Sequence, residues 1–248
     1  MNNKGLDNNY ELVIIWARKE ELNCKFQDLF KPIILNGKKV KVINLPYVGP
    51  GIVNKGHNTI SEIIKNYYKK KSIVFFNQVK EQTNNKNIFI STYEEWYKNN
   101  NKYNMFFLKE SIKKQVDKYL EKFSNNMVGV HIRRTDNTVS IANSPSGLYE
   151  KKIEEFLVED SNRKFFVASD DEKEIINLRE KYGEEKIITQ ANIDRRRNSR
   201  EGIKSALVDL YLLANTEVII GSYYSSFTDV AAAIDQRKLI IIGNHERE

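Results

Sequence analysis

The second half of the chain alternates between short apolar runs and segments whose apolar residues recur at helical spacing. Four helices are predicted between five strand-like runs, at 148–160, 170–183, 200–215 and 225–235. The five strand-like runs lie at 127–132, 164–169, 186–190, 217–222 and 238–243. Strands separated by helices are typical of a parallel sheet that helices cover on both faces. The pattern therefore predicts an α/β domain in this half.

The first half is less regular. Strands are predicted at 11–17, 39–47, 72–79 and 87–92, and helices at 59–70 and 106–123. Residues 26–35 fit a short helix or an irregular segment. The Ser-Asn-Asn-Met stretch at 124–127 is the one plausible linker between the halves. We therefore predict two α/β domains, residues 1–123 and 124–248.

Composition narrows the class of protein. Of the 248 residues 40% are hydrophobic, enough for a buried core, and the single cysteine, Cys24, excludes an intramolecular disulfide. No segment reaches the roughly 20 apolar residues that span a bilayer, and the first residues lack the apolar core of a secretory signal. These features predict a cytoplasmic protein without a membrane span.

The charge balance points to an anionic partner. Lys and Arg total 40 against 33 Asp and Glu, which gives a net charge of +7. Such an excess attracts nucleotides, nucleic acids or acidic surfaces. The lysines are scattered among asparagines, however, which is more typical of a solvated surface than of a nucleic-acid groove. No nucleic-acid partner is expected, although the basic run at 192–200 keeps that alternative open.

The stretch VGVHIRRTDNT, residues 128–138, places charge at the end of an apolar strand. Ligands of open α/β sheets bind beyond the carboxyl ends of the strands. The planar donors of Arg133 and Arg134 suit a phosphate, while His131 could contact a base or a ribose. Asp136 could hold an arginine in place. The alternative is an Arg–Asp ion pair that only fixes a loop.

Two carboxylates, Asp170 and Asp171, follow the next strand. They could accept hydrogen bonds from a base edge or a ribose. The alternative is helix capping, because Ser169 followed by Glu172 has capping-box spacing and carboxylates suit a helix N-terminus. The residues by themselves favour the cap.

Two further positions are candidates for ligand binding. Asp209 lies in the apolar window 206–214, where a buried carboxylate is costly unless it is paired or bound. We favour a functional carboxylate over one that is partly exposed at the helix edge. Ser225 and Ser226 follow a strand and precede a helix, whose N-terminus could bind phosphate. An ordinary cap, with Ser226 and Asp229 at capping-box spacing, is the alternative.

Several nucleotide and metal motifs are absent from the sequence. The turn at Gly49–Gly51 has Asn54 where the dinucleotide fingerprint has its third glycine, so an ordinary turn is favoured. There is no Gly-Lys-Ser/Thr phosphate loop, no His/Cys metal spacing and no Asp-x-Asp pair. We therefore expect neither a metal nor another cofactor.

The order of these sites resembles the carboxyl-terminal half of the fucosyltransferase superfamily, which includes α1,6-fucosyltransferases, the nodulation fucosyltransferase and protein O-fucosyltransferases. The likeness covers roughly residues 127–243, and His-x-Arg-Arg-Thr-Asp is its most specific segment. It implies a GT-B-like fold of two Rossmann-like domains with parallel sheets, the first one trimmed. It also implies metal-independent transfer of fucose from GDP-fucose.

The resemblance further implies roles for individual residues. Arg133 corresponds to the arginine that holds the donor β-phosphate, His131 to the histidine beside guanosine, and Asp209 to the aspartate that reads guanine. The remaining matches are a carboxylate pair at the base and ribose, Asp170 and Asp171, and the phosphate-binding serines, Ser225 and Ser226.

The chain departs from this superfamily at two places. Asn137 and Ile141 stand where α1,6 enzymes have a lysine and a candidate catalytic glutamate, and only MNNKGLDNN precedes the first strand, where a Gly-rich turn and a long helix are usual. We expect an inverting glycosyltransferase that moves fucose or a related sugar from a GDP-sugar to a glycan or another hydroxyl acceptor. Arg133 and Asp136 are its candidate catalytic residues. A non-catalytic nucleotide-sugar-binding protein is the alternative.

Overall fold

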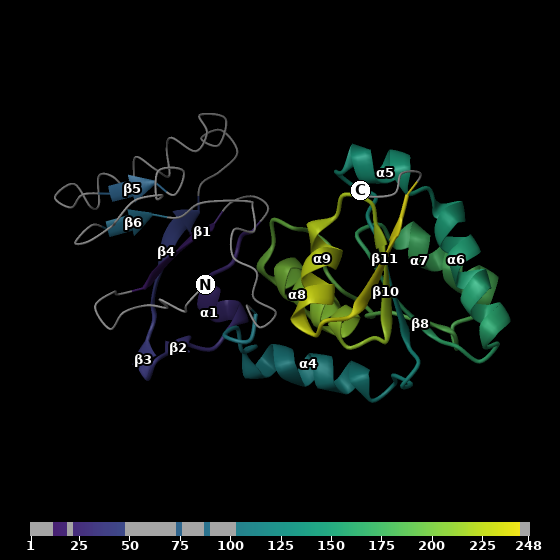
Figure 1. Ribbon diagram of the computed structural model, residues 1–248, viewed down its shortest axis with the longest axis horizontal. Coiled ribbons are helices and arrows are strands. Elements are labelled where there is room, and N and C mark those ends of the chain that lie inside the picture. Colours follow the sequence, from purple (N-terminus) through teal and green to yellow (C-terminus); the bar gives the residue numbers. More distant parts are fainter. Residues whose placement is uncertain (1–11, 19–21, 48–72, 76–86, 90–102, 244–248) are drawn as a thin grey trace, which may run out of the picture. The chain divides into compact units, whose positions relative to one another are not determined.

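A computed structural model describes residues 12–18, 22–47, 73–75, 87–89 and 103–243 (Figure 1). Its internal contacts divide the chain into two compact units, one formed by 1–46 with 100–248 and the other by 47–99. The predicted boundary after residue 123 lies inside the first unit. The two predicted domains therefore stay a prediction.

Apart from Tyr47, the second unit is described only at two strands. β5 (Ile73–Phe75) and β6 (Asn87–Phe89) pair in parallel, with Ile73 opposite Asn87. Both lie within predicted strands. The helix predicted at 59–70 and the turn at Gly49–Gly51 fall outside the described residues.

The first unit is built on a five-stranded parallel sheet, and all five predicted strands are confirmed. The strands run in the order β11-β10-β7-β8-β9, so β7 lies at the centre. Their bounds are Val128–Ile132 (β7), Phe165–Ser169 (β8), Ile187–Ile188 (β9), Val218–Ser222 (β10) and Lys238–Ile242 (β11).

The predicted helices of this unit are also present. They are α4 (Glu110–Leu120), α6 (Ser146–Glu159), α7 (Glu172–Tyr182), α8 (Arg200–Ala214) and α9 (Ser226–Ile234). One short helix, α5 (Thr138–Asn143), lies between the strand predicted at 127–132 and the helix predicted at 148–160, where no helix was predicted. The side chain of Asn137 caps α5 by accepting a hydrogen bond from the backbone N–H of Ser140.

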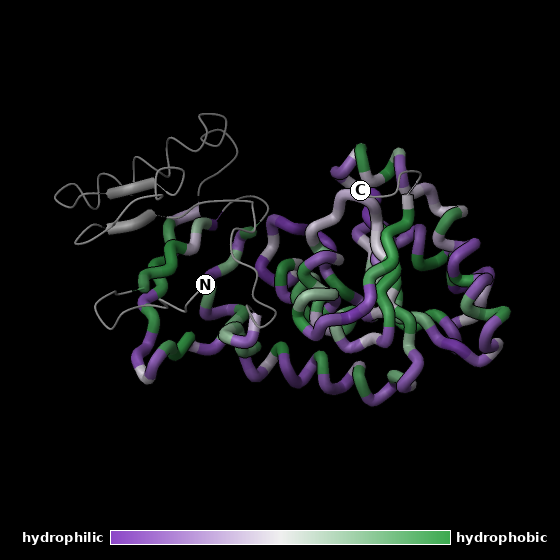
Figure 2. Tube along the Cα trace, viewed as in Figure 1, coloured by the Kyte–Doolittle hydropathy of each residue, from purple (hydrophilic) through white to green (hydrophobic). Residues whose placement is uncertain are grey.

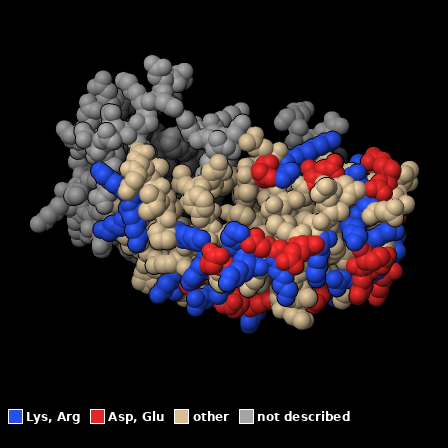
Figure 3. Space-filling model, turned by 90° about the horizontal axis from the view of Figure 1, so that it is seen from below, with Lys and Arg blue, Asp and Glu red and all other residues tan. Residues whose placement is uncertain are grey.

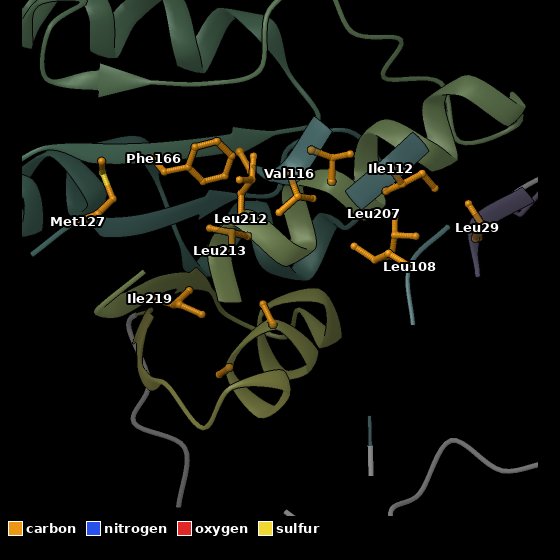
Figure 4. Packing of buried hydrophobic residues seen from close by; sticks show 14 of the residues in the cluster. Leu29, Leu108, Ile112, Val116, Met127, Phe166, Leu207, Leu212, Leu213 and Ile219 are labelled. Atoms are coloured by element: carbon orange, nitrogen blue, oxygen red, sulfur yellow. The ribbon is translucent and has the colours of Figure 1, made fainter. Parts of the chain in front are cut away.

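Side-chain alternation along the strands creates two separate cores. Val128, Val130 and Ile132 of β7 pack on one face with α6 and α7. Phe166 of β8 and Ile219 of β10 pack on the other face with α4, α8 and α9 (Figure 4). The strands are therefore hydrophobic along their length and lie between helices with hydrophilic outer surfaces (Figure 2).

Glycine at position 221 lets α9 approach the sheet. A Cβ there would lie 2.8 Å from the side-chain atoms of Thr228 in α9. Gly221 pairs with His131 across β10 and β7. The close approach therefore holds the N-terminal turn of α9 near the carboxyl end of β7.

The amino-terminal segment, up to residue 46, belongs to the same unit. It contains β1 (Val13–Arg18), α1 (Phe26–Leu29), β2 (Ile34–Leu35), β3 (Lys38–Lys39) and β4 (Lys41–Tyr47), with β1 paired to β4 and β2 antiparallel to β3. Asp28 of α1 forms a 2.7 Å ion pair with Arg200 of α8. Within the described ranges, no helix has the length and apolar character needed to cross a membrane.

We predict that Gly221→Ala destabilises the fold by about 1–3 kcal/mol, because the added methyl group forces α9 away from β10. Gly147→Ala is the matched control: nothing lies within 4 Å of its Cβ position, near the start of α6, and alanine favours helix. Urea unfolding measures both. Equal stability of the two variants would contradict the close packing of α9.

Candidate active site

A pocket of about 660 Å³ lies beyond the carboxyl ends of β7, β8 and β10. That volume is typical of sites for drug-sized ligands and cofactors. Seven of the nine predicted site residues line it: His131, Arg133, Asp136, Asp170, Asp209, Ser225 and Ser226.

Arg133 is fixed at the strand end by two carboxylates. Its guanidinium pairs with Asp136 and, over 2.8 Å, with Asp170. Its backbone N–H donates to Oγ of Ser222, 2.9 Å away in β10. The side chain is only 15% exposed. The pair with Asp136 that the sequence predicts is therefore present, and the pair with Asp170, which was not predicted, also holds the guanidinium at the pocket wall.

Asp170 anchors the turn that follows β7. It accepts hydrogen bonds from the backbone N–H of Arg134 (2.7 Å) and from the backbone N–H and hydroxyl of Thr135 (3.2 and 2.7 Å). Burial alone would raise the pKa of this carboxyl, but the hydrogen bonds and the charge of Arg133 outweigh it and lower the pKa. Asp170 is therefore an ionised anchor of the turn.

The structure does not bring Arg134 and Asp171 to the pocket. Arg134 pairs with Glu174 of α7 over 2.7 Å, and its guanidinium lies 5.6 Å from the ring centre of Tyr149 in α6. It thus faces the side of the sheet that α6 and α7 cover. Asp171 caps α7 by accepting from the backbone N–H of Lys173, as the capping interpretation predicts. The cap is Asp171 itself and not Ser169.

His131 lies buried on the α8 and α9 side of the sheet. Its ring stacks on Phe227 of α9, with 4.7 Å between ring centres. Burial lowers the pKa of the imidazole to about 4, so the ring is neutral near pH 7. Its Nδ1 has no hydrogen-bond partner within the described part of the chain. A buried polar atom at a pocket wall is suited to bind a ligand.

Asp209 is the deepest carboxylate of the pocket. It is 8% exposed and accepts a 2.6 Å hydrogen bond from Nε2 of Gln190. Burial raises the pKa of Asp209 to about 7, although the Gln190 hydrogen bond acts in the opposite direction. A nearly neutral pKa in a cleft is typical of functional carboxylates.

The N-terminus of α9 forms another wall. Ser225 is the N-cap residue, but its side chain makes no capping hydrogen bond, and Ser226 begins the helix. Both serines line the pocket. The positive end of the helix dipole there is suited to an anion. Tyr224 directly precedes the cap, with a φ of 56°.

Two arginines of the pocket were not among the predicted site residues. Arg197 pairs with Asp136 over 2.8 Å, and Nε of Arg195 donates to the backbone carbonyl of Ser169 over 3.3 Å. Arg196, between them, turns outward and pairs with Asp194. All three belong to the basic run after β9. This run directly follows a predicted strand, and that position could have indicated that its arginines reach the site.

The amino-terminal segment supplies one part of the apolar lining, beside apolar side chains of α8 and α9. The amino-terminal side chains involved are Trp16, Leu22, Leu29 and Phe30. Nε1 of Trp16 donates to the backbone carbonyl of Cys24 over 2.9 Å, which fixes the indole. In the ranges that the structure covers, no group of three or more His, Cys, Asp or Glu side chains is arranged to hold a metal ion.

Comparison with solved structures shows the fold. The NodZ alpha-1,6-fucosyltransferase co-crystallized with GDP matches at a TM-score of 0.56 and 17% identity, over 90% of this chain and 92% of that chain. The same protein soaked with GDP-fucose matches at 0.57 and 17%, over 91% and 93%. Fucosyltransferase NodZ from Bradyrhizobium matches at 0.56 and 16%, over 90% and 92%. The predicted GT-B-like α/β fold is therefore confirmed.

Comparison with sequences shows the family. No curated protein matches the chain. Residues 96–239, more than half of the chain, match the family described as alpha-(1,6)-fucosyltransferase N- and catalytic domains. The matched range includes β7 to β10 and every predicted site residue. The chain therefore belongs to this fucosyltransferase family and is a glycosyltransferase.

Proposed function

We propose that the chain transfers fucose from GDP-fucose to a hydroxyl group of a glycan or another acceptor, without a metal ion. The observation that carries this proposal is that Arg133, the N-terminus of α9 and the buried Asp209 line the same pocket. Structures of the similar NodZ enzyme were obtained with GDP and with GDP-fucose.

We assign the donor diphosphate to the positive side of the pocket. Arg133 and the N-terminal turn of α9, with Ser225 and Ser226, offer charge-assisted and backbone hydrogen bonds to phosphate oxygens. Arg195 and Arg197 line the same pocket and add positive charge. Fixed guanidinium groups can stabilise a departing diphosphate as a metal ion does in other transferases.

We assign the guanine base to the neighbourhood of Asp209. An ionised carboxylate can accept from the N1–H and the 2-amino group of guanine together, a donor pair that adenine and uracil lack. Nδ1 of His131, which has no hydrogen-bond partner among the described residues, offers a further polar contact for the base or the ribose. A site built on such bonds rejects bases that leave its buried polar groups unpaired.

The expected chemistry is one inverting displacement. The acceptor oxygen attacks the anomeric carbon on the face opposite the diphosphate. The bond between that carbon and the β-phosphate oxygen breaks, GDP leaves with the bonding electrons, and the acceptor proton passes to a base. Asp136, beside Arg133, is the candidate base, but its two oxygens already bind Arg133 and Arg197. This geometry favours a role in orienting the arginines.

A non-catalytic GDP-sugar-binding protein is the main alternative. It is favoured by Asn137, whose side chain caps α5 and donates to the carbonyl of Tyr224, at the place where the resemblance implies a lysine. Nucleic-acid binding has less support, because basic and acidic side chains are intermixed along the lower part of the described surface in Figure 3.

Two measurements separate these functions. A ligand that binds only the native state raises its melting temperature, so GDP and GDP-fucose should stabilise the protein more than UDP-sugars or single-stranded RNA. GDP release from GDP-fucose should then require a hydroxyl acceptor and yield a fucosylated product. Stabilisation without product would favour the non-catalytic alternative, and no stabilisation would reject the GDP-sugar site.

We predict opposite consequences for the two adjacent arginines. Arg133→Ala should abolish fucose transfer and weaken GDP binding while the protein stays folded, because Asp170 keeps its hydrogen bonds from Arg134 and Thr135. Arg134→Ala should lower stability by about 3 kcal/mol, because Glu174, 13% exposed, loses its buried partner. Calorimetry with GDP and urea unfolding distinguish them. Arg196→Ala is the control, since this exposed arginine lies outside the pocket lining. Equal GDP affinity in the Arg133 and Arg196 variants would contradict the assignment of Arg133 to the donor diphosphate.

We predict that EDTA leaves both GDP binding and fucose transfer unchanged. The arginines of the pocket supply the positive charge that a divalent cation would otherwise bring to the diphosphate. Initial rates with EDTA, with manganese and with magnesium test this expectation. A rate that is lost on chelation and restored by either metal would show that a cation is required.

We predict that guanosine binding weakens as the pH falls from about 8 to about 6. Guanine donates to the ionised form of Asp209, whose pKa in the free protein is about 7, so protonation removes the acceptor. Guanosine is the preferred probe because it lacks the phosphate group that titrates near pH 6.

Asp209→Asn is the matched variant for this titration. It should weaken guanosine binding by about 1–3 kcal/mol and flatten the pH dependence. The melting temperature without ligand should not fall. If the variant instead unfolds more easily and retains the nucleotide affinity of the wild type, Asp209 has only a packing role.

A further inference from the structure

Tyr224 is an exposed aromatic side chain at the mouth of the pocket. It lines the cavity, yet 66% of it is exposed to solvent. Of the residues assigned to the donor, the Arg133 side chain and Asp209 are much less exposed, at 15% and 8%, whereas the Arg197 side chain is 47% exposed. Tyr224 therefore belongs to the open side of the pocket, beyond the donor groups.

The backbone of Tyr224 has a conformation that residues other than glycine rarely adopt. Its φ of 56° lies in the left-handed region, which costs a residue with a Cβ about 1–2 kcal/mol. Glycine or asparagine would make the same turn at lower cost. In the described ranges, the other non-glycine residues with positive φ are Asn36, Asn192 and Gln236. A bulky aromatic ring is therefore not explained by the turn, and its exposure shows that burial gives little compensation.

The neighbouring structure holds this conformation. Nδ2 of Asn137 donates to the backbone carbonyl of Tyr224 over 3.0 Å, while Oδ1 of the same side chain caps α5. Val139 of α5 also lines the pocket and is 46% exposed. Asn137 thus ties together two segments that present apolar side chains at the pocket mouth. Strain that the surroundings maintain is characteristic of functional sites.

We propose that Tyr224 binds the acceptor by stacking its ring on the apolar face of an acceptor sugar. This inference rests on the proposed transferase function and assigns a residue to the acceptor side of the pocket. A transfer reaction needs both substrates in one cavity, and Arg133 and Asp209 hold the donor on the buried side, which leaves the exposed side at Tyr224 for the acceptor. A sugar ring presents C–H groups on one face and hydroxyl groups around its edge. A rigid tyrosine provides large contact area at low entropic cost.

Two substitutions separate stacking from turn formation. Tyr224→Asn removes the ring and keeps a residue that tolerates positive φ, whereas Tyr224→Phe keeps the ring. The probes are the methyl β-glycosides of glucose, galactose, mannose and N-acetylglucosamine, each titrated at saturating GDP-fucose. We expect Tyr224→Asn to raise the acceptor KM about tenfold, and Tyr224→Phe to stay within about twofold of the wild type. The melting temperature of Tyr224→Asn should be equal or higher, because the strain is relieved.

GDP binding in the same variants separates this inference from the proposed function. Both variants should bind GDP as the wild type does. Wild-type acceptor KM in Tyr224→Asn would overturn the stacking role, and a parallel loss of GDP affinity would move Tyr224 to the donor site. Wild-type protein that binds GDP but uses no glycoside would reject a carbohydrate acceptor while the donor assignment stands. Wild-type protein that fails to bind GDP would reject the proposed function itself.

Discussion

The contact between Asp170 and the turn after β7 organises the whole site. This one carboxylate, at the end of β8, accepts hydrogen bonds from the backbone of Arg134 and Thr135 and pairs with the guanidinium of Arg133. Each charge-assisted hydrogen bond contributes about 1.5–3 kcal/mol. The turn is therefore fixed before any ligand arrives, and so are Arg133 on one side of β7 and Arg134 on the other.

The unequal strength of the surrounding ion pairs suggests which contact a diphosphate would replace. Arg133 and Asp170 are 15% and 12% exposed, so their pair is weakly screened by solvent. The pair of Asp136 with Arg197 joins side chains that are about half exposed, and such pairs contribute about 0–1 kcal/mol. A donor diphosphate would compete with Asp136 at little cost and leave Asp170 in place. Asp136 then serves as an exchangeable counter-ion for both arginines in the unliganded pocket.

The strands and long helices of the first unit could be predicted from the sequence because their apolar patterns are uninterrupted. The directions in which the side chains point were harder to predict. The period of two along β7 already implies that Arg133 and Arg134 face opposite sides, yet both had been assigned to substrate, because an Arg-Arg pair suggests phosphate binding. Helix α5 was not predicted, since its start depends on a cap by Asn137 and not on hydrophobic periodicity. Arg195 and Arg197 were not assigned to the site, because a run of three arginines does not reveal which of them turns inward.

The residues on the two sides of the pocket differ in how readily they can be predicted from the sequence. The donor side consists of charged or buried polar residues, at strand ends or, for Asp209, inside α8. Such residues are conspicuous because burial of an unpaired charge is costly. The open side is formed by exposed apolar residues, which are ordinary on any protein surface. Tyr224 becomes unusual only when its backbone angle is known, since the same ring at a negative φ would need no explanation. The proposed acceptor contact can thus be recognised only from the local backbone geometry, whereas the donor contacts can be recognised from the residue types.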